Sequence, residues 1–281
     1  TRGAHQGREG LRTNSAVREM ATVSIQLVAN SGVLVQYRGL RFLIDGIYGN
    51  NPYFTPPRKE IQKAVFGMNS PFRDVEFLLF THRHTDHFDA AYTDEYARNN
   101  RVRGIYVPRA GADPASFLED RRPLPKAAEQ GVLHELSPEK EQALSIPLWD
   151  DCAATYVPTR HLDVQTYAAV RHCAVLLSIG RVRLLFAADA DWSPENRERF
   201  LALGPLTAVF ITPLFLLHPD GRRLLEQIMP EQVVLYHLPF QRDDVTGLRA
   251  VAEKELARSN PFRLTALMEP GQMLDGIEPW R

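Results

Sequence analysis

Cysteine is scarce in this chain. Cys152 and Cys173 are the only two cysteines among 281 residues, and both lie in apolar runs with the composition of strands. This pair offers neither a disulfide framework nor the closely spaced ligands of a cysteine-rich zinc site. We therefore expect two reduced thiols in a packed core.

Long hydrophobic runs are also missing. No apolar stretch approaches the 18 residues that suggest a membrane-spanning helix. Residues 1–20 are polar and contain several arginines, so they lack the apolar centre of a secretory signal. We expect this segment to be a disordered leader, with Met20 as an alternative natural start. These features predict a cytoplasmic protein that does not enter a membrane.

Neither sign of charge is in excess. The chain has 33 Lys+Arg against 34 Asp+Glu, which gives a formal net charge of -1. The overall charge therefore gives no reason to expect a nucleic acid or an anionic membrane as the partner. We expect a small-molecule substrate instead, and a homo-oligomer remains open.

Strand and helix signals follow one another in a layered pattern. Residues 37–40 (YRGL) suggest a hairpin turn, residues 75–80 (VEFLLF) have the length of a buried strand, and residues 89–99 have helical composition. A last long helix is predicted over residues 243–259. Strand pairs come first and strands alternating with helices follow, which predicts mixed sheets in one domain over residues 21–281.

Three histidines and one aspartate follow the apolar run at residues 75–80. They are His82, His84, Asp86 and His87. Imidazole nitrogens and carboxylate oxygens are good ligands for zinc and also suit manganese or iron. His82 and His84 are two residues apart, so in an extended segment their side chains point the same way and can hold one metal. Asp86 and His87 follow a turn and can reach a second metal. Chance histidines in a polar loop are the alternative.

Residues 81–87 (THRHTDH) resemble the HxHxDH signature of the metallo-β-lactamase superfamily. The resemblance extends over nearly the whole chain from about Val23, and residues 43–46 (LIDG) resemble the end of the family's opening strands. It implies an α+β fold, a four-layer αβ/βα sandwich with mixed β-sheets. It also implies two divalent metal ions, zinc first and manganese or iron as alternatives, at the rim between the sheets.

The resemblance implies a further histidine for the first metal, after a later strand. His161 fits this position, in the segment PTRH. His172 is the competitor, but it lies at the start of a strand run and is assigned a structural role. A last histidine ligand is expected at a strand end, where His237 follows the run VVLY.

A bridging aspartate is implied just past another apolar strand. Asp189 follows the run LLFAA, with Ala188 where the family usually has glycine, and Asp191 is the alternative. The implied first site is His82, His84 and His161, and the second is Asp86, His87 and His237. Asp189 and a water-derived hydroxide would bridge the two metals.

Three further residues are candidates for supporting roles. Asp45 ends a strand before the site and is expected either to orient a metal-bound histidine or to lie in a surface turn. Arg83 and Arg160 flank candidate ligands and are expected to add positive charge at the rim of the site, if they are not ordinary surface arginines.

These residues predict a metal-dependent hydrolase that uses a metal-bound hydroxide, because a divalent metal lowers the pKa of water to about 7. Asp86 is the candidate catalytic residue, as a proton acceptor or an orienting group. The substrate is expected to be a small anionic ester, lactone or phosphodiester. The chain looks most similar to the branch that includes L-ascorbate-6-phosphate lactonase. The alternatives are an iron-dependent redox enzyme, an RNA- or DNA-processing nuclease, and a metal-binding module without turnover.

Overall fold

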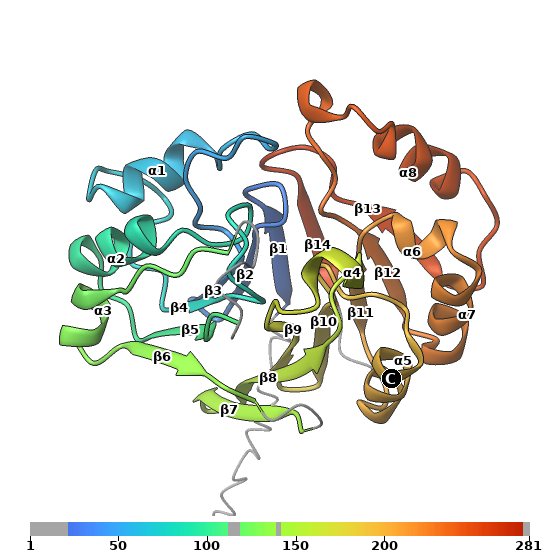
Figure 1. Cartoon of the computed structure of the whole chain (residues 1–281), viewed down its shortest axis with the longest axis horizontal. Helices are drawn as coiled ribbons and strands as arrows, with labels where there is room; N and C mark the ends of the chain where they lie inside the picture. The colour runs from blue at the N-terminus through green and yellow to red at the C-terminus, as the bar shows by residue number, and fades with distance from the viewer. Residues whose placement is uncertain (1–21, 112–118, 139–141, 278–281) are drawn as a thin grey trace, which may run out of the picture.

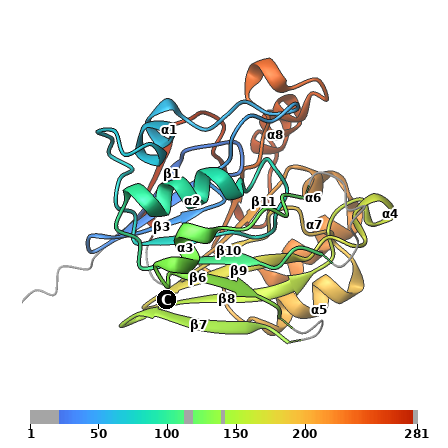
Figure 2. The ribbon, with the colours of Figure 1, turned by 60° about the vertical axis from the view of Figure 1, so that its left-hand side comes forward.

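The computed structural model describes residues 22–111, 119–138 and 142–277. The expected leader at residues 1–20 lies outside this part of the chain. Two seven-stranded mixed sheets face each other, and helices cover the outer side of each (Figure 1). Figure 2 shows the same helical layers from a second direction. The predicted four-layer α+β sandwich is confirmed.

The first sheet has the strand order β14-β1-β2-β3-β4-β5-β6. Its strands are β1 (Val23–Leu27), β2 (Val33–Tyr37), β3 (Leu40–Ile44), β4 (Phe77–Leu79), β5 (Gly104–Pro108), β6 (Leu133–Leu136) and β14 (Met273–Ile277). The expected hairpin joins β2 to β3. Both of its turn residues, Arg38 and Gly39, have positive φ, which is the turn that matches the twist of a hairpin.

The second sheet has the order β13-β12-β11-β10-β9-β8-β7. Its strands are β7 (Leu144–Trp149), β8 (Cys152–Thr159), β9 (His172–Ile179), β10 (Val182–Phe186), β11 (Ala208–Ile211), β12 (Gln232–Leu235) and β13 (Arg263–Ala266). β8 and β9 are antiparallel, as are β9 and β10, whereas β10 to β13 run parallel. The C-terminal ends of β8, β10 and β12 therefore lie at one edge of the sheet.

Three buried clusters correspond to the three interfaces of the sandwich. One lies between the sheets, and the other two lie between each sheet and its helices. The helices on the first sheet are α1 (Lys59–Val65), α2 (Ala90–Asn99) and α3 (Pro125–Glu129). The second sheet is covered by α5 (Pro194–Ala202), α6 (Leu214–Leu217), α7 (Pro219–Ile228) and α8 (Leu248–Leu256), while α4 (Val164–Tyr167) buries no side chain.

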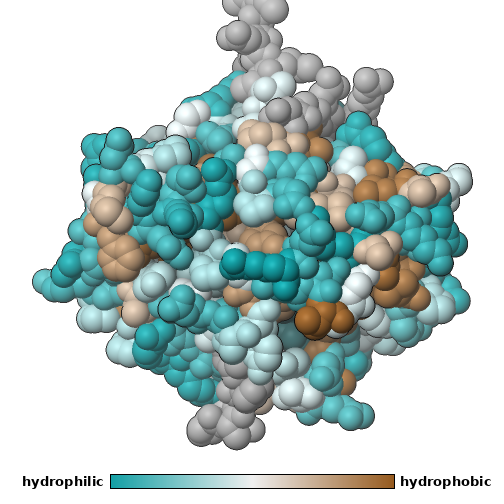
Figure 3. Space-filling view, turned by 90° about the horizontal axis from the view of Figure 1, so that it is seen from above, coloured by the Kyte–Doolittle hydropathy of each residue, from teal (hydrophilic) through white to brown (hydrophobic). Residues whose placement is uncertain are grey.

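The two cysteines are buried and unpaired, as expected. None of the described helices combines the length and apolarity that crossing a membrane requires. Hydrophilic residues predominate on the face shown in Figure 3, and hydrophobic side chains form smaller patches there.

The prediction of a long helix over residues 243–259 is wrong at its start. A short 3-10 turn, η1 (Gln241–Asp243), comes first, and Gly247 has a φ of +72°. The Asp244 carboxylate accepts hydrogen bonds from the backbone N–H groups of Leu248 and Arg249, at 2.9 and 3.1 Å. A helix therefore begins only at Leu248, and the residues before it form a loop.

Candidate metal centre

The predicted ligands come together at the ends of four strands. The segment with His82 and His84 follows β4 of the first sheet. His161 follows β8, Asp189 follows β10 and His237 follows β12, all in the second sheet. Since the C-terminal ends of these three strands lie at one edge, the predicted ligands lie close together between the sheets.

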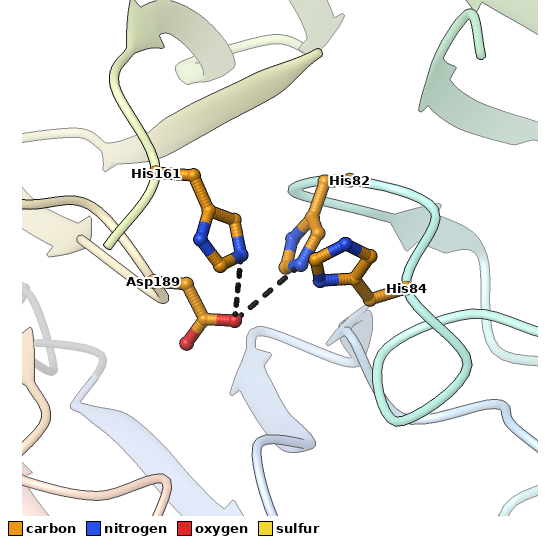
Figure 4. A group of neighbouring side chains, drawn as sticks. All are labelled: His82, His84, His161 and Asp189. Carbon is orange, nitrogen blue, oxygen red and sulfur yellow. Dashed lines mark ion pairs between the residues drawn. The ribbon is translucent and has the colours of Figure 1, made fainter. Parts of the chain in front are cut away.

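Four side chains form the first group (Figure 4). The ring nitrogens Nε2 of His82 and His161 lie 3.4 and 3.3 Å from Oδ2 of Asp189. The ring of His84 lies beside that of His161, with the centroids 4.8 Å apart. His82 and His84 point into the same space, as their spacing predicts.

Asp86, His87 and His237 form the second group. The two Nε2 atoms lie 2.9 Å apart, and Oδ2 of Asp86 lies 3.6 Å from His87 and 3.7 Å from His237. Asp189 contacts this group too, through Oδ2 at 3.2 Å from His87 and Oδ1 at 3.1 Å from His237. One carboxylate thus lies against both groups, in the position expected of a bridge.

The donor atoms fit divalent metal ions. Two ligands bonded at about 2.1 Å in a tetrahedral site lie about 3.4 Å from each other, close to the separations around Asp189. The Nε2 atoms of His82, His84 and His161 are buried, and none has a hydrogen-bond partner among the described residues. Buried nitrogens without a partner are costly, and an ion would satisfy all three.

Asp45 holds ligands in both groups. It is fully buried, which excludes the surface-turn alternative. Its carboxylate lies 2.9 Å from Nδ1 of His87, and it accepts the hydroxyl of Thr81 at 2.7 Å. Because that hydroxyl donates to Asp45, the Thr81 oxygen accepts from Nδ1 of His82 at 2.9 Å. These contacts pair Nδ1 of both imidazoles with oxygen acceptors, so Nε2 is the nitrogen that each ring would offer to a metal.

Backbone and amide groups orient two more ligands. Nδ1 of His161 donates to the carbonyl of Leu162 at 2.6 Å. The side-chain amide of Asn30 lies 3.0 Å from Nδ1 of His237, and the Asn30 Oδ1 atom is buried without a partner. Rotating this amide by half a turn pairs its oxygen with an N–H at Nδ1 and frees Nε2 of His237.

Burial and neighbouring charges set the protonation of the ligands. Burial lowers the pKa of His84 to about 3 and that of His82 well below its ordinary value. Burial alone would also lower the pKa of His87, but the nearby carboxylates of Asp86 and Asp189 raise it well above the ordinary value. Burial opposes ionisation of Asp189, yet the surrounding histidines hold its pKa well below the usual range. Neutral imidazoles and an ionised carboxylate are the forms that bind metal.

The backbone is strained at three positions in or beside the centre. Asp45, Ala188 and His237 have φ values of +48°, +47° and +53°, in the region that favours glycine. Glycine, which the resemblance leads one to expect at this position, adopts the left-handed conformation of Ala188 more readily than alanine does. The Ala188 N–H donates to the hydroxyl of Tyr236 at 3.0 Å, which helps to hold the turn. Such strain is concentrated at functional sites.

His172 is outside the two groups, and its structural assignment agrees with its contacts. Its Nε2 accepts the backbone N–H of Asp189 at 3.2 Å, and its Nδ1 lies 2.7 Å from the Thr159 hydroxyl. Asp191 also lies outside the groups. It accepts from the Ser193 N–H and binds the side chain of Asn196 at the start of α5.

The expectation for the two arginines does not agree with the structure. Arg83 is buried and points away from the centre, donating to the carbonyls of Pro108 and Asp120 and to Glu135. Arg160 is paired with Asp191, with 2.8 Å between Nη2 and Oδ2. Neither arginine lines the pocket at the candidate centre.

A pocket of about 590 Å³ opens onto both groups. His84, Asp86, His161, Asp189 and His237 form part of its lining, together with aromatic and aliphatic side chains. Its size is within the range of small-molecule sites. Sequence reasoning missed these walls because they come from loops far apart in the chain. It also missed the contacts of Asn30 and Thr81, although Thr81 is adjacent to the first histidine.

Comparison with models of protein families and with curated protein sequences finds no match. Solved structures do match. YhfI from Bacillus subtilis, described as a metallo-β-lactamase fold protein, has a TM-score of 0.59 and 14% identity over 91% of this chain and 100% of its own. An isothiocyanate hydrolase from Delia radicum gut bacteria has a TM-score of 0.56 and 13% identity, over 89% and 98% of the two chains.

A third similar structure is that of CmlA, a diiron β-hydroxylase from Streptomyces venezuelae. Its TM-score is 0.53 and its identity 18%, over 91% of this chain and 54% of CmlA. The present chain therefore spans about half the length of CmlA. At these identities the likeness is one of fold, and the chain has the metallo-β-lactamase fold.

Proposed function

We propose that this protein is a metal-dependent hydrolase of small molecules with two divalent ions bound by the two groups. The observation that supports this most directly is a cluster of three buried Nε2 atoms without a hydrogen-bond partner among the described residues. Those of His82 and His161 lie within 3.4 Å of an Asp189 oxygen, and His84 belongs to the same group. In the proposal His82, His84 and His161 hold one ion, Asp86, His87 and His237 hold the other, and Asp189 contacts both.

Two bound divalent ions would lower the pKa of a water molecule and polarise the bond to be cleaved. The side chains contribute positioning and proton transfer. Asp45 fixes the rings of His82 and His87 through their Nδ1 atoms, so both imidazoles present Nε2. Asp86 lines the pocket, and in the proposal its carboxylate would accept a proton from water and pass it to the leaving group.

An ester or a lactone is the substrate class that we propose, which retains the lactonase-like part of the sequence interpretation. The anionic part of that interpretation was based on the positive charge of the metals and on Arg83 and Arg160, and neither arginine lines the pocket. A nuclease has no specific observation in its favour, because the net charge is near zero and the pocket has the size of a small-molecule site.

An iron-dependent redox reaction is the second candidate. It is supported by the similarity in fold to CmlA, which is described as a diiron β-hydroxylase, and by the suitability of histidine and carboxylate ligands for iron. The metal present in freshly purified protein, together with oxygen consumption, distinguishes the two candidates.

The experiment combines metal analysis with a substrate screen. Emission spectrometry on protein reconstituted with zinc, manganese or iron should give about two ions per chain, and the loaded protein should cleave small esters or lactones. His82→Ala should lose both properties. An Arg160→Ala variant is a matched control near the centre and should keep both. A metal ratio near zero after each reconstitution would refute the proposal.

A further inference from the structure

The pocket above the candidate centre is walled by apolar side chains. Phe54, Leu162, Tyr167, Leu214, Val245 and Leu248 line it. Two of these side chains lie directly beside the predicted ligands. The Phe54 ring lies 6.0 Å from that of His237, and the Tyr167 ring lies 4.9 Å from that of His84 and 4.7 Å from that of His161, between centroids. Each group of ligands thus has an aromatic ring next to it.

Cations are missing from this wall. Among the lining residues that the structure describes, none is a lysine or an arginine. Apart from the predicted ligands, the charged members are the carboxylates of Asp163 and Asp243. The nearby Arg242 does not line the pocket, and its Nε donates to the Thr55 hydroxyl at 2.8 Å and lies 3.7 Å from Asp243. A phosphate on a ligand would therefore face carboxylates and would have no basic partner among the lining residues.

Among the described lining residues other than the predicted ligands, one buried neutral polar group has no hydrogen-bond partner. Thr212 lines the pocket, and its Oγ1 is buried without a hydrogen bond to any described residue. At the mouth, the side chains of Val245 and Tyr53 are 93% and 54% exposed. An uncharged polar atom of a ligand can satisfy the hydroxyl, and an apolar group can cover the exposed side chains.

We propose that the site takes an uncharged ester or lactone with an apolar acyl or aryl group, and that it discriminates against phosphorylated and carboxylated substrates. This inference rests on the proposed hydrolase function. In the reaction one water adds across the acyl C–O bond. The acyl carbon gains the oxygen of water and becomes a carboxylic acid, the leaving oxygen gains a proton and becomes an alcohol, and nothing is oxidised or reduced.

The kinetic test uses metal-loaded protein and p-nitrophenyl esters from acetate to octanoate. We expect kcat/KM to rise roughly fourfold per added methylene until the pocket is full, the size expected for burying one CH2 group. The succinate monoester and bis(p-nitrophenyl) phosphate should have a lower kcat/KM than the uncharged butyrate ester.

Val245→Arg should reduce the preference for long uncharged chains and raise kcat/KM for the succinate ester. The control Leu217→Arg adds the same charge at an exposed side chain outside the pocket and should change neither.

A binding test separates this inference from the function on which it rests. The metal-free protein is titrated with 2-nonanone, an uncharged ketone, and with inorganic phosphate, and its melting temperature is followed. The ketone should stabilise the protein, and phosphate should have no effect. Thr212→Val and Val245→Arg should each weaken ketone binding about fivefold.

If no ester is cleaved by protein with two metals, the hydrolase proposal fails, and the ketone result still decides the preference of the pocket. Faster cleavage of the anionic substrates, or no ketone binding, would overturn the inference.

Discussion

The Asp45 carboxylate lies 2.9 Å from Nδ1 of His87, and both side chains are fully buried. The same carboxylate reaches His82 through the hydroxyl of Thr81. One acidic group in the first sheet therefore orients one predicted ligand in each group, although it belongs to neither.

Asp45→Asn should weaken metal binding at both groups. Oδ2 of Asp45 faces both Nδ1 of His87 and the Thr81 hydroxyl, while Oδ1 accepts the Thr81 backbone N–H. An asparagine has only one acceptor oxygen, so it cannot serve both sides of this arrangement. We expect a loss of about 10–100-fold in affinity, the usual effect of changing a residue that orients a ligand. Competition with a chromophoric chelator measures the two dissociation constants. Asp191→Asn is the matched control, because that carboxylate is also largely buried but contacts only Arg160 and the start of α5, so its metal affinity should not change.

Asp189→Ala should weaken the binding of both ions, whereas His237→Ala should weaken mainly the binding of one. The Asp189 oxygens lie within 3.4 Å of histidines in both groups. Among the predicted ligands, Asp86, His87 and Asp189 contact the His237 ring. Metal content after gel filtration distinguishes these patterns. Loss of both ions from an Asp191→Ala variant, with Asp189→Ala unaffected, would contradict the assignment of the bridge.

Asn30→Ala should lower the affinity of the second group alone. The Asn30 amide is the hydrogen-bond partner of Nδ1 in His237, so its loss frees the ring to rotate and to change tautomer. We expect about a tenfold loss. Asn30→Asp supplies an acceptor oxygen and should keep most of the affinity. Nitrogen-15 spectra of the imidazoles would report the tautomer directly, and an unchanged His237 signal in Asn30→Ala would count against this role.

Ala188→Gly should leave the free energy of unfolding unchanged or raise it by up to about 1 kcal/mol. The φ of +47° at Ala188 is unfavourable for alanine and readily adopted by glycine. Ala187→Gly is the matched control, since Ala187 is equally buried but does not have positive φ. It should lose about 1 kcal/mol. Urea denaturation of both variants measures the difference, and equal losses would show that the strain has no energetic effect.

Removal of metal should lower the melting temperature of the protein. Each group combines residues of both sheets, so an ion bound there joins the two halves of the sandwich. A free ion at a thousand times its dissociation constant stabilises the folded state by about 4 kcal/mol. Scanning calorimetry with and without a chelator measures this effect, and the chelator should shift the Asp189→Ala variant less. An equal shift in that variant would indicate that the chelator acts elsewhere.

Much of the fold and of the centre was predictable because the signals are local. A short apolar strand followed by histidines at residues 82, 84 and 87 is one contiguous signal, and the hairpin turn at Arg38 and Gly39 is another. The direction of Arg83 could have been predicted by the same alternation that turns His82 and His84 toward one side, because the residue between them faces the other. The expectation that Arg83 adds positive charge at the rim overlooked this alternation.

The remaining features depend on contacts between distant segments. The pocket wall combines the loop near Phe54 with Tyr167 and with the loop near Val245, and no local pattern relates these segments. The start of α8 depends on the side chain of Asp244, which competes with a longer helix by capping the N–H groups of Leu248 and Arg249. Neither the pocket wall nor the start of α8 can therefore be read from the spacing of hydrophobic residues in the sequence.

The pairing of β14 with β1 has a consequence for how the protein is made. Ile25 in β1 has Leu274 as its partner, so the outer edge of the first sheet is covered by a strand that leaves the ribosome about 250 residues later. Until then, β1 presents unpaired N–H and C=O groups that can pair with another chain. During translation this edge is therefore open to aggregation, and a chaperone that covers it would protect the nascent chain until β14 is made.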